Sequence, residues 1–116
     1  MTLSADQPDF CALFPPGAEL TRLATGFTWT EGPVWVPARH GEESGGVIFS
    51  DVRQNRTWRY SPAGLQPEMD PSHHQNGHCL DAQGRLIACS HGERALLRQE
   101  AGGAGRFWLP TGKASA

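Results

Sequence analysis

The residues that could do chemistry in this sequence stand at the starts and ends of short apolar segments. Glu31 precedes a glycine and then an apolar run, Asn76 stands in the same setting further on, and Asp51 follows an apolar run. A carboxylate such as Glu31 suits a hard divalent cation, but it is also a common surface group before a strand. Asn76 with Gly77 is equally a turn pair, and Asp51 can cap a turn as readily as line a site.

Histidine and cysteine also cluster in the second half of the chain, at His73, His74, His78, Cys79 and His91. Their spacing matches no standard zinc pattern. His78 and Cys79 are adjacent in a predicted strand, so their side chains should point to opposite faces. With Cys11 and Cys89 the chain has three cysteines and no CxxC pair. We interpret these cysteines as reduced, small apolar residues rather than as metal ligands or disulfides.

Composition excludes several classes of protein. The chain has 116 residues, 38% of them hydrophobic, and a net charge of −2, which is typical of a globular domain and not of a nucleic-acid-binding one. It has no apolar run near the roughly 20 residues that cross a bilayer, so we expect no membrane partner. The first ten residues lack the basic start and apolar core of a secretory signal. We therefore expect a cytoplasmic protein.

Short strands are the elements that must position these residues. Frequent prolines exclude long helices, and no helical stripe of apolar residues is present. Arg56–Tyr60 shows the clearest alternation, with Arg56, Trp58 and Tyr60 on one face and Thr57 and Arg59 on the other. We expect segment 65–75 to be a loop. The predicted strands are 20–25, 32–36, 47–50, 56–60, 77–80, 86–89 and 94–98.

The strands form an internal repeat. Segment 46–51 (GVIFSD) aligns with 85–90 (RLIACS), and at the same offset 56–59 aligns with 95–98. Upstream, 31–35 (EGPVW) aligns with 76–80 (NGHCL), and the difference in offset places a polar insertion at 38–44 of the first copy. Glu31 and Asn76 are therefore equivalent positions, and we expect them to approach one another.

A repeat of about 40 residues, all of it β, is typical of propeller blades. We therefore predict an all-β fold that consists of the first two blades of a six-bladed β-propeller and is incomplete. The alternative is a β-sandwich in which short apolar strands resemble one another by chance. The repeated polar residue and glycine before each first strand favours the propeller, because innermost strands begin at the central channel.

Taken together, these motifs resemble the gluconolactonase/regucalcin (senescence marker protein) family, over about residues 19–100. The motifs are TEGPVW at 30–35, IFSD at 48–51, NGHCLDAQGRL at 76–86 and CSHG at 89–92. The resemblance implies a six-bladed propeller with a divalent metal, Ca²⁺ or alternatively Zn²⁺ or Mn²⁺, at the top of the channel. It also implies hydrolysis of sugar lactones as the activity and a sugar lactone as the partner.

The resemblance further implies roles for individual residues. Glu31 takes the place of a metal ligand and Asn76 that of a substrate-binding residue. His74 stands where some members carry a substrate-binding arginine, and His91 is expected at the channel mouth, near substrate. The remaining ligands, an Asn and an Asp, come from later blades, which this sequence does not contain. A metal with oxygen ligands would polarise the lactone carbonyl and activate a water molecule.

Two functions follow as hypotheses. The first is a metal-dependent sugar-lactone hydrolase in truncated form, which we expect to be inactive because Glu31 alone cannot hold the cation tightly. The alternative is a non-catalytic remnant or binding module. Two blades also leave open sheet faces and edges, so we expect the isolated chain to aggregate or to be only partly ordered.

The chain divides into a polar lead (residues 1–18), a partial propeller (19–105) and a tail (106–116) that we expect to be aberrant or disordered. Members of the family continue at this point with a pattern like L-A-x-x-W-x-G-K/R-R. Permitted codons for 107–116, read in another frame, encode Leu-Ala-Ala-Asn-Trp-Gln-Gly-Gln-Arg. We therefore predict a reading-frame shift near residue 107, with an ordinary disordered terminus as the alternative. The coding DNA tests this prediction.

Overall fold

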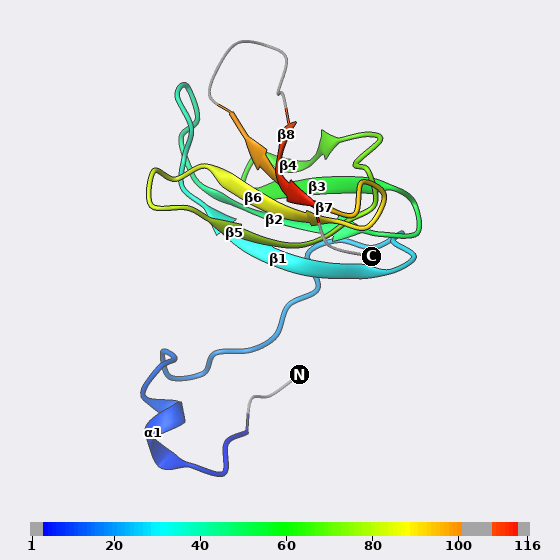
Figure 1. Cartoon of the computed structure of the whole chain (residues 1–116). Helices are drawn as coiled ribbons and strands as arrows, with labels where there is room; N and C mark the ends of the chain where they lie inside the picture. The colour runs from blue at the N-terminus through cyan, green and yellow to red at the C-terminus, as the bar shows by residue number, and fades with distance from the viewer. Residues whose placement is uncertain (1–3, 101–107, 114–116) are drawn as a thin grey trace.

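Two antiparallel sheets, each with four strands, make up the body of the molecule (Figure 1). The computed structural model describes residues 4–100 and 108–113, with side chains as far as residue 100. The first sheet has the order β1-β2-β3-β4 and the second β5-β6-β7-β8. The strands are β1 (Thr30–Val36), β2 (Gly46–Asp51), β3 (Arg56–Ser61), β4 (Gly64–Met69), β5 (Gln75–Leu80), β6 (Leu86–Ser90), β7 (Ala95–Gln99) and β8 (Trp108–Lys113).

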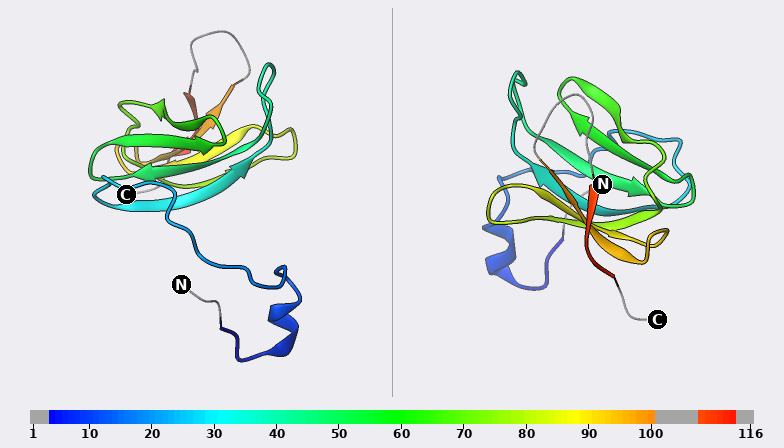
Figure 2. Two further views of the ribbon diagram at one scale, coloured as in Figure 1. Left: turned by 180° about the vertical axis from the view of Figure 1, so that it is seen from behind. Right: turned by 45° about the horizontal axis from the view of Figure 1, so that its top comes forward.

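A long lead precedes the first sheet, and in the structure it comprises residues 4–29, beyond the 1–18 expected from the sequence. It contains one short helix, α1 (Pro8–Cys11), and the left view of Figure 2 shows α1 standing away from the sheets. The predicted strand at 20–25 is wrong: these residues are neither strand nor helix. Within the described residues, no helix has the length and apolar character needed to cross a membrane.

Strand register confirms the repeat residue by residue. Trp35 pairs with Val47 in the first sheet, and their counterparts Leu80 and Leu86 pair in the second. The next pair of strands agrees in the same way. Ile48 pairs with Arg59 in the first sheet, and their counterparts Ile87 and Arg98 pair in the second. Register also shifts within one residue of the equivalent place, in β1 between Glu31 and Val34 and in β5 between Gln75 and His78. The two sheets are therefore two copies of one blade.

The fourth strand of each blade corrects the sequence prediction. β4 occupies residues that were expected to form a loop, and β8 pairs with β7 where the repeat was expected to fail. Pro67 of β4 lies opposite Trp58, and Pro110 of β8 lies opposite the equivalent Leu97. Proline is tolerated here because β4 and β8 are the last strands of their sheets. Residues 106–107 and 114–116 of the tail lie outside the described residues, and the frame shift stays a prediction.

The core lies between the two blades. Val36, Ile48 and Leu86 are buried there, and Val34 and Leu80 pack against them. Alternation along the strands explains this choice of residues, since side chains two apart point to the same face. In β6, Leu86, Ala88 and Ser90 are buried, whereas Ile87 is half-buried and Cys89 is exposed. Each blade therefore turns one face toward the other blade and one face away from it.

Candidate functional site

The blades meet most closely where their first strands begin. Gly32 has a φ of +65°, and a Cβ built on it would lie 2.0 Å from the backbone oxygen of Asn76. His78 Nδ1 lies 2.7 Å from the backbone oxygen of Gly32, and Ser50 Oγ donates to the backbone oxygen of Asn76 at 2.8 Å. Only glycine fits such a position, both in conformation and in space. The segments that hold Glu31 and Asn76 therefore lie together at the backbone, and the approach of the two side chains stays a prediction.

Asn76 combines burial with an unused acceptor. Its side-chain oxygen, Oδ1, is buried and has no hydrogen-bond partner among the described residues. Buried polar side-chain atoms in proteins are nearly always paired, and leaving one unpaired costs about 1–3 kcal/mol. The amide at the start of β5 therefore has capacity for a donor from outside the described part of the chain.

Glu31 lies at the equivalent position of β1 and is half-buried. It has no hydrogen-bond or ion-pair partner in the described part of the chain. Its side chain borders a pocket of about 370 Å³ whose other walls are mostly apolar, including Phe27, Pro33 and Phe49. The carboxylate is thus available for a cation or for a hydrogen-bond donor.

His74 and His91 lie side by side in the backbone at the same end of the second blade. The His91 N–H donates to the His74 carbonyl at 3.0 Å, and the His74 N–H donates to Asn55 Oδ1 at 2.8 Å. His74 Nδ1 also lies 3.2 Å from the carbonyl of Val52, and both imidazoles are exposed. Their predicted role in binding substrate stays a prediction.

Asp51 has a structural role. Asp51 is only 1% exposed. Its two carboxylate oxygens accept hydrogen bonds from the backbone N–H groups of Thr28 (3.0 Å) and Trp29 (2.9 Å). Those bonds attach the end of the lead to the end of β2. The sequence left open a site residue or a cap of the following turn; the structure shows a third role, because both oxygens bind backbone N–H groups more than 20 residues away in the sequence.

His78 is held between the blades. Nε2 lies 3.2 Å from Gln75 Oε1, and Nδ1 can donate only to the Gly32 carbonyl. Burial lowers the pKa of His78 below 6.5, and the bond to Gly32 opposes that shift in part. In a neutral imidazole that donates from Nδ1, Nε2 is an acceptor. The Gln75 side chain satisfies this acceptor when its amide nitrogen, rather than its oxygen, faces Nε2. No group of three or more histidine, cysteine, aspartate or glutamate residues comes together in the described ranges, so the histidines form no zinc cluster there.

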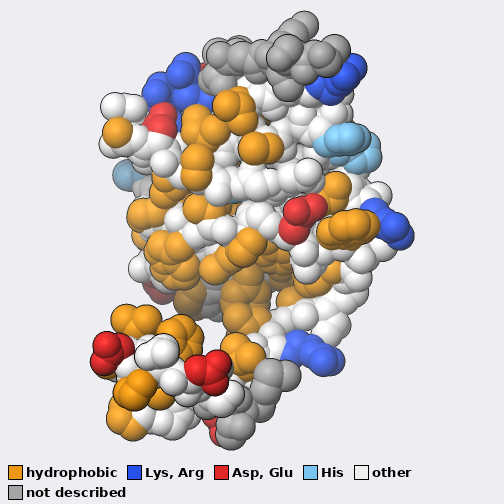
Figure 3. All heavy atoms as spheres, turned by 60° about the horizontal axis from the view of Figure 1, so that its bottom comes forward, with side chains coloured by type: hydrophobic (Ala, Val, Ile, Leu, Met, Phe, Trp, Pro, Cys, Tyr) orange, Lys and Arg blue, Asp and Glu red, His pale blue; other side chains and the backbone are white. Residues whose placement is uncertain are grey.

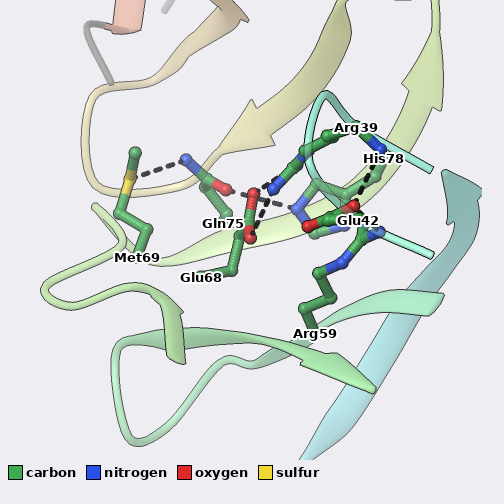
Figure 4. Close-up of polar contacts among 7 residues, drawn as sticks. All are labelled: Arg39, Glu42, Arg59, Glu68, Met69, Gln75 and His78. Carbon is green, nitrogen blue, oxygen red and sulfur yellow. Dashed lines mark hydrogen bonds and ion pairs between the residues drawn. The ribbon is translucent and has the colours of Figure 1, made fainter. Parts of the chain in front are cut away.

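An ion-pair network covers the same inter-blade region, and sequence reasoning missed it (Figure 4). Arg39 binds Glu68 through two contacts of 2.6 and 3.1 Å, and Glu42 binds Arg59 at 2.8 Å. Arg39 and Glu42 come from the polar insertion of the first copy. Burial lowers the pKa of Arg59, which is 4% exposed and leaves Nη1 buried without a partner among the described residues. Opposite charges within the insertion were the only sequence signal.

Two solved structures are similar to the chain. A crystal structure provisionally described as a gluconolactonase is 61% identical, with a TM-score of 0.80, and the match covers 97% of this chain and 38% of that one. A gluconolactonase from Xanthomonas campestris, described as important in glucose secondary metabolic pathways, is 30% identical with a TM-score of 0.58. That match covers 72% of this chain and 26% of that one. No family model matches the chain, and no curated protein matches it significantly.

Proposed function

Because the chain belongs to the gluconolactonase family and spans 38% of the 61%-identical relative, we propose that it is part of a metal-dependent sugar-lactone hydrolase. The proposed binding end is the one where β1 and β5 begin. The identity of 61% supports the family, and the geometry at Gly32 and Asn76 supports this end as the site.

The observation that carries the proposal is the unpaired Oδ1 of Asn76, which lies beside the segment that holds Glu31. Sugar lactones carry several hydroxyl groups, and each is a hydrogen-bond donor that a buried amide oxygen can accept. Glu31 adds a carboxylate at the equivalent position of the other blade. Two acceptors on neighbouring inner strands thus suit a polyhydroxylated ligand.

The described residues do not fit a tightly bound cation on their own. Ca²⁺ takes six to eight oxygen ligands, and zinc sites usually take four ligands. This end of the blades offers the Glu31 carboxylate and the Asn76 amide, and no cluster of three histidine, cysteine, aspartate or glutamate residues forms there among the described residues. We therefore expect no lactone hydrolysis by the isolated chain with added Ca²⁺, Zn²⁺ or Mn²⁺. Hydrolysis that Glu31→Ala abolishes would contradict this expectation.

A chimaera tests the proposal itself. The portion of the 61%-identical relative that matches this chain would be replaced by this chain, and gluconolactone hydrolysis would be measured with and without a chelator. We expect metal-dependent hydrolysis that Glu31→Ala reduces at least about a hundredfold, as for loss of a metal ligand. The matched control is Glu43→Ala, an exposed carboxylate in the insertion, which should leave the rate unchanged. A folded chimaera that hydrolyses lactone equally well with Glu31→Ala would overturn the proposal.

A further inference from the structure

The two candidate site residues stand where the pairing of the inner strands is interrupted. In β1 the register with β2 shifts just after Glu31, and in β5 the register with β6 shifts just after Gln75. Gly32 and Asn76 therefore lie at the irregular positions of the two strands. An irregularity of this kind re-aims the side chains around it. Contacts outside the strand ladders must then fix the directions of Glu31 and Asn76.

One imidazole contacts both irregular stretches. His78 Nδ1 lies 2.7 Å from the Gly32 carbonyl oxygen, to which it can only donate. Nε2 of the same ring lies 3.2 Å from Oε1 of Gln75 (Figure 4). Gly32 directly follows Glu31 in the chain, and Gln75 directly precedes Asn76. The His78 ring therefore links the neighbour of one candidate site residue to the neighbour of the other.

Ser50 is a second link between the same strands. It pairs with Glu31 across β1 and β2, and its hydroxyl donates to the Asn76 carbonyl at 2.8 Å. Ser50 and Gln75 are both 0% exposed. Water does not compete for hydrogen bonds at buried positions, so such contacts constrain geometry more firmly than surface ones. The two links together hold β1 against β5 beside Glu31 and Asn76.

The pocket beside Glu31 does not orient its carboxylate. Figure 3 shows apolar side chains gathered beside the lead, on the side that the view presents. Phe27 of the lead and Pro33 and Phe49 of the first blade form apolar walls of the pocket, and Phe27 packs edge-on against Phe49 with ring centroids 5.1 Å apart. Apolar walls offer a carboxylate no hydrogen bond. The direction of Glu31 therefore depends on its backbone, which the contact at the Gly32 carbonyl holds.

The repeat separates this role from what a blade itself needs. Pro33 takes the place of His78 in the first blade. Cys89 takes the place of Ser50 in the second blade. Proline has no side-chain donor or acceptor, and a cysteine thiol is a weak one. Both blades nevertheless form the same strands. His78 and Ser50 therefore serve the junction of the blades and not the fold of either blade.

We propose that His78 is a positioning residue of the lactone site. By holding the residue after Glu31 and the residue before Asn76, it fixes the two candidate ligand-binding side chains relative to one another. Site residues keep a productive geometry only when neighbouring groups hold them. This role requires no contact between His78 and the substrate. The inference rests on the proposed function, in which Glu31 and Asn76 bind the ligand.

A matched pair of variants tests the positioning on the full chain. His78→Asn keeps an N–H near the place of Nδ1, whereas His78→Leu has a similar shape and no donor. In NMR spectra of the isotope-labelled chain, His78→Leu should shift the backbone amide of Glu31 and the side-chain amide of Asn76 more than His78→Asn does. Both variants lack the ring, so the difference between them reports the lost N–H.

The control for these spectra is His40→Leu, at an exposed histidine of the polar insertion, which should shift neither signal. Equal shifts for His78→Asn and His78→Leu would overturn the proposal, and so would shifts as large for His40→Leu.

The chimaera with the 61%-identical relative tests the consequence for the reaction. His78→Leu should lower kcat/KM for gluconolactone roughly 10- to 100-fold, and His78→Asn should recover most of that loss. A residue that only fills space gives the opposite order, because a buried position accepts leucine more readily than asparagine.

Two results separate this proposal from the proposed function. An unchanged kcat/KM for His78→Leu, in a chimaera that Glu31→Ala inactivates, would overturn the role of His78 and leave the proposed function intact. A folded chimaera without any hydrolysis would instead overturn the proposed function, and the spectra of the full chain would still decide whether His78 positions the two side chains.

Discussion

At the scale of single residues, the polar side chains at the ends of the inner strands divide into structural groups and available groups. Asp51 has both oxygens occupied by backbone N–H groups, whereas Asn76 Oδ1 is buried with no partner in the described part of the chain. Burial alone therefore does not identify a site residue. What distinguishes a candidate site residue is whether its acceptor oxygens are already occupied by hydrogen bonds within the described part of the chain.

The occupied carboxylate of Asp51 yields a prediction about stability. Asp51→Ala should lower the free energy of unfolding by about 2–4 kcal/mol, because two backbone N–H groups lose a charged acceptor. Chemical denaturation measures the loss. The control is Asp70→Ala, at an exposed ion pair with Arg56, where we expect less than about 1 kcal/mol. Equal losses would contradict the structural role of Asp51.

His78 should make stability depend on pH. Burial lowers its pKa in the folded chain below 6.5, so the folded state binds the proton less readily than the unfolded state. The contribution of neutral His78 to the free energy of unfolding should therefore be complete above pH 6.5. It should decrease as the pH falls from 6.5 through the lowered pKa. His78→Gln should reduce that slope in urea titrations, and His91→Gln, at an exposed imidazole, should not. A slope that His78→Gln leaves unchanged would refute the assignment.

At the scale of elements, the contact between β1 and β5 depends on one glycine. Gly32→Ala should destabilise the chain by roughly 3 kcal/mol or more, since its Cβ would overlap the Asn76 carbonyl and its φ is +65°. Gly77 is the equivalent residue in the second blade, and a Cβ there meets no atom within 4 Å. Gly77→Ala should change stability by less than about 1 kcal/mol. Thermal unfolding compares the two variants, and similar shifts in Tm would contradict the close approach.

Sequence alone predicted the strands whose apolar residues alternate. Ile48 and Leu86 belong to such strands. The repeat also predicted that Glu31 and Asn76 approach one another, and the structure brings their segments together at Gly32. β4 was not predicted because its residues do not alternate between apolar and polar, and because Pro67 and the charged Glu68 are typical of a loop. The only sign that the polar insertion gave of its contacts with the blades was its opposite charges, because its partners Arg59 and Glu68 are fixed by tertiary structure and not by local spacing.

At the scale of the whole molecule, the two blades are alike in register but not in surroundings. One face of each blade is covered by the other blade, and the second face of each is open or only partly covered by the lead. The sequence led us to expect aggregation of the isolated chain. That expectation rests on the exposed side chains of these faces, such as Trp35 and Leu96, and it stays a prediction.

Two copies of one blade pack through equivalent strands, and one face of each blade is buried in their contact. Ile48 and Ile87 are equivalent residues, but Ile48 is 0% exposed between the blades and Ile87 lies on the outer face. Chemical denaturation of Ile48→Ala and Ile87→Ala, which measures the free energy of unfolding of each variant, tests this packing. We predict a loss of about 3–4 kcal/mol for Ile48→Ala and less than about 1.5 kcal/mol for Ile87→Ala. Equal losses, or a larger loss for Ile87→Ala, would contradict the packing of the two blades.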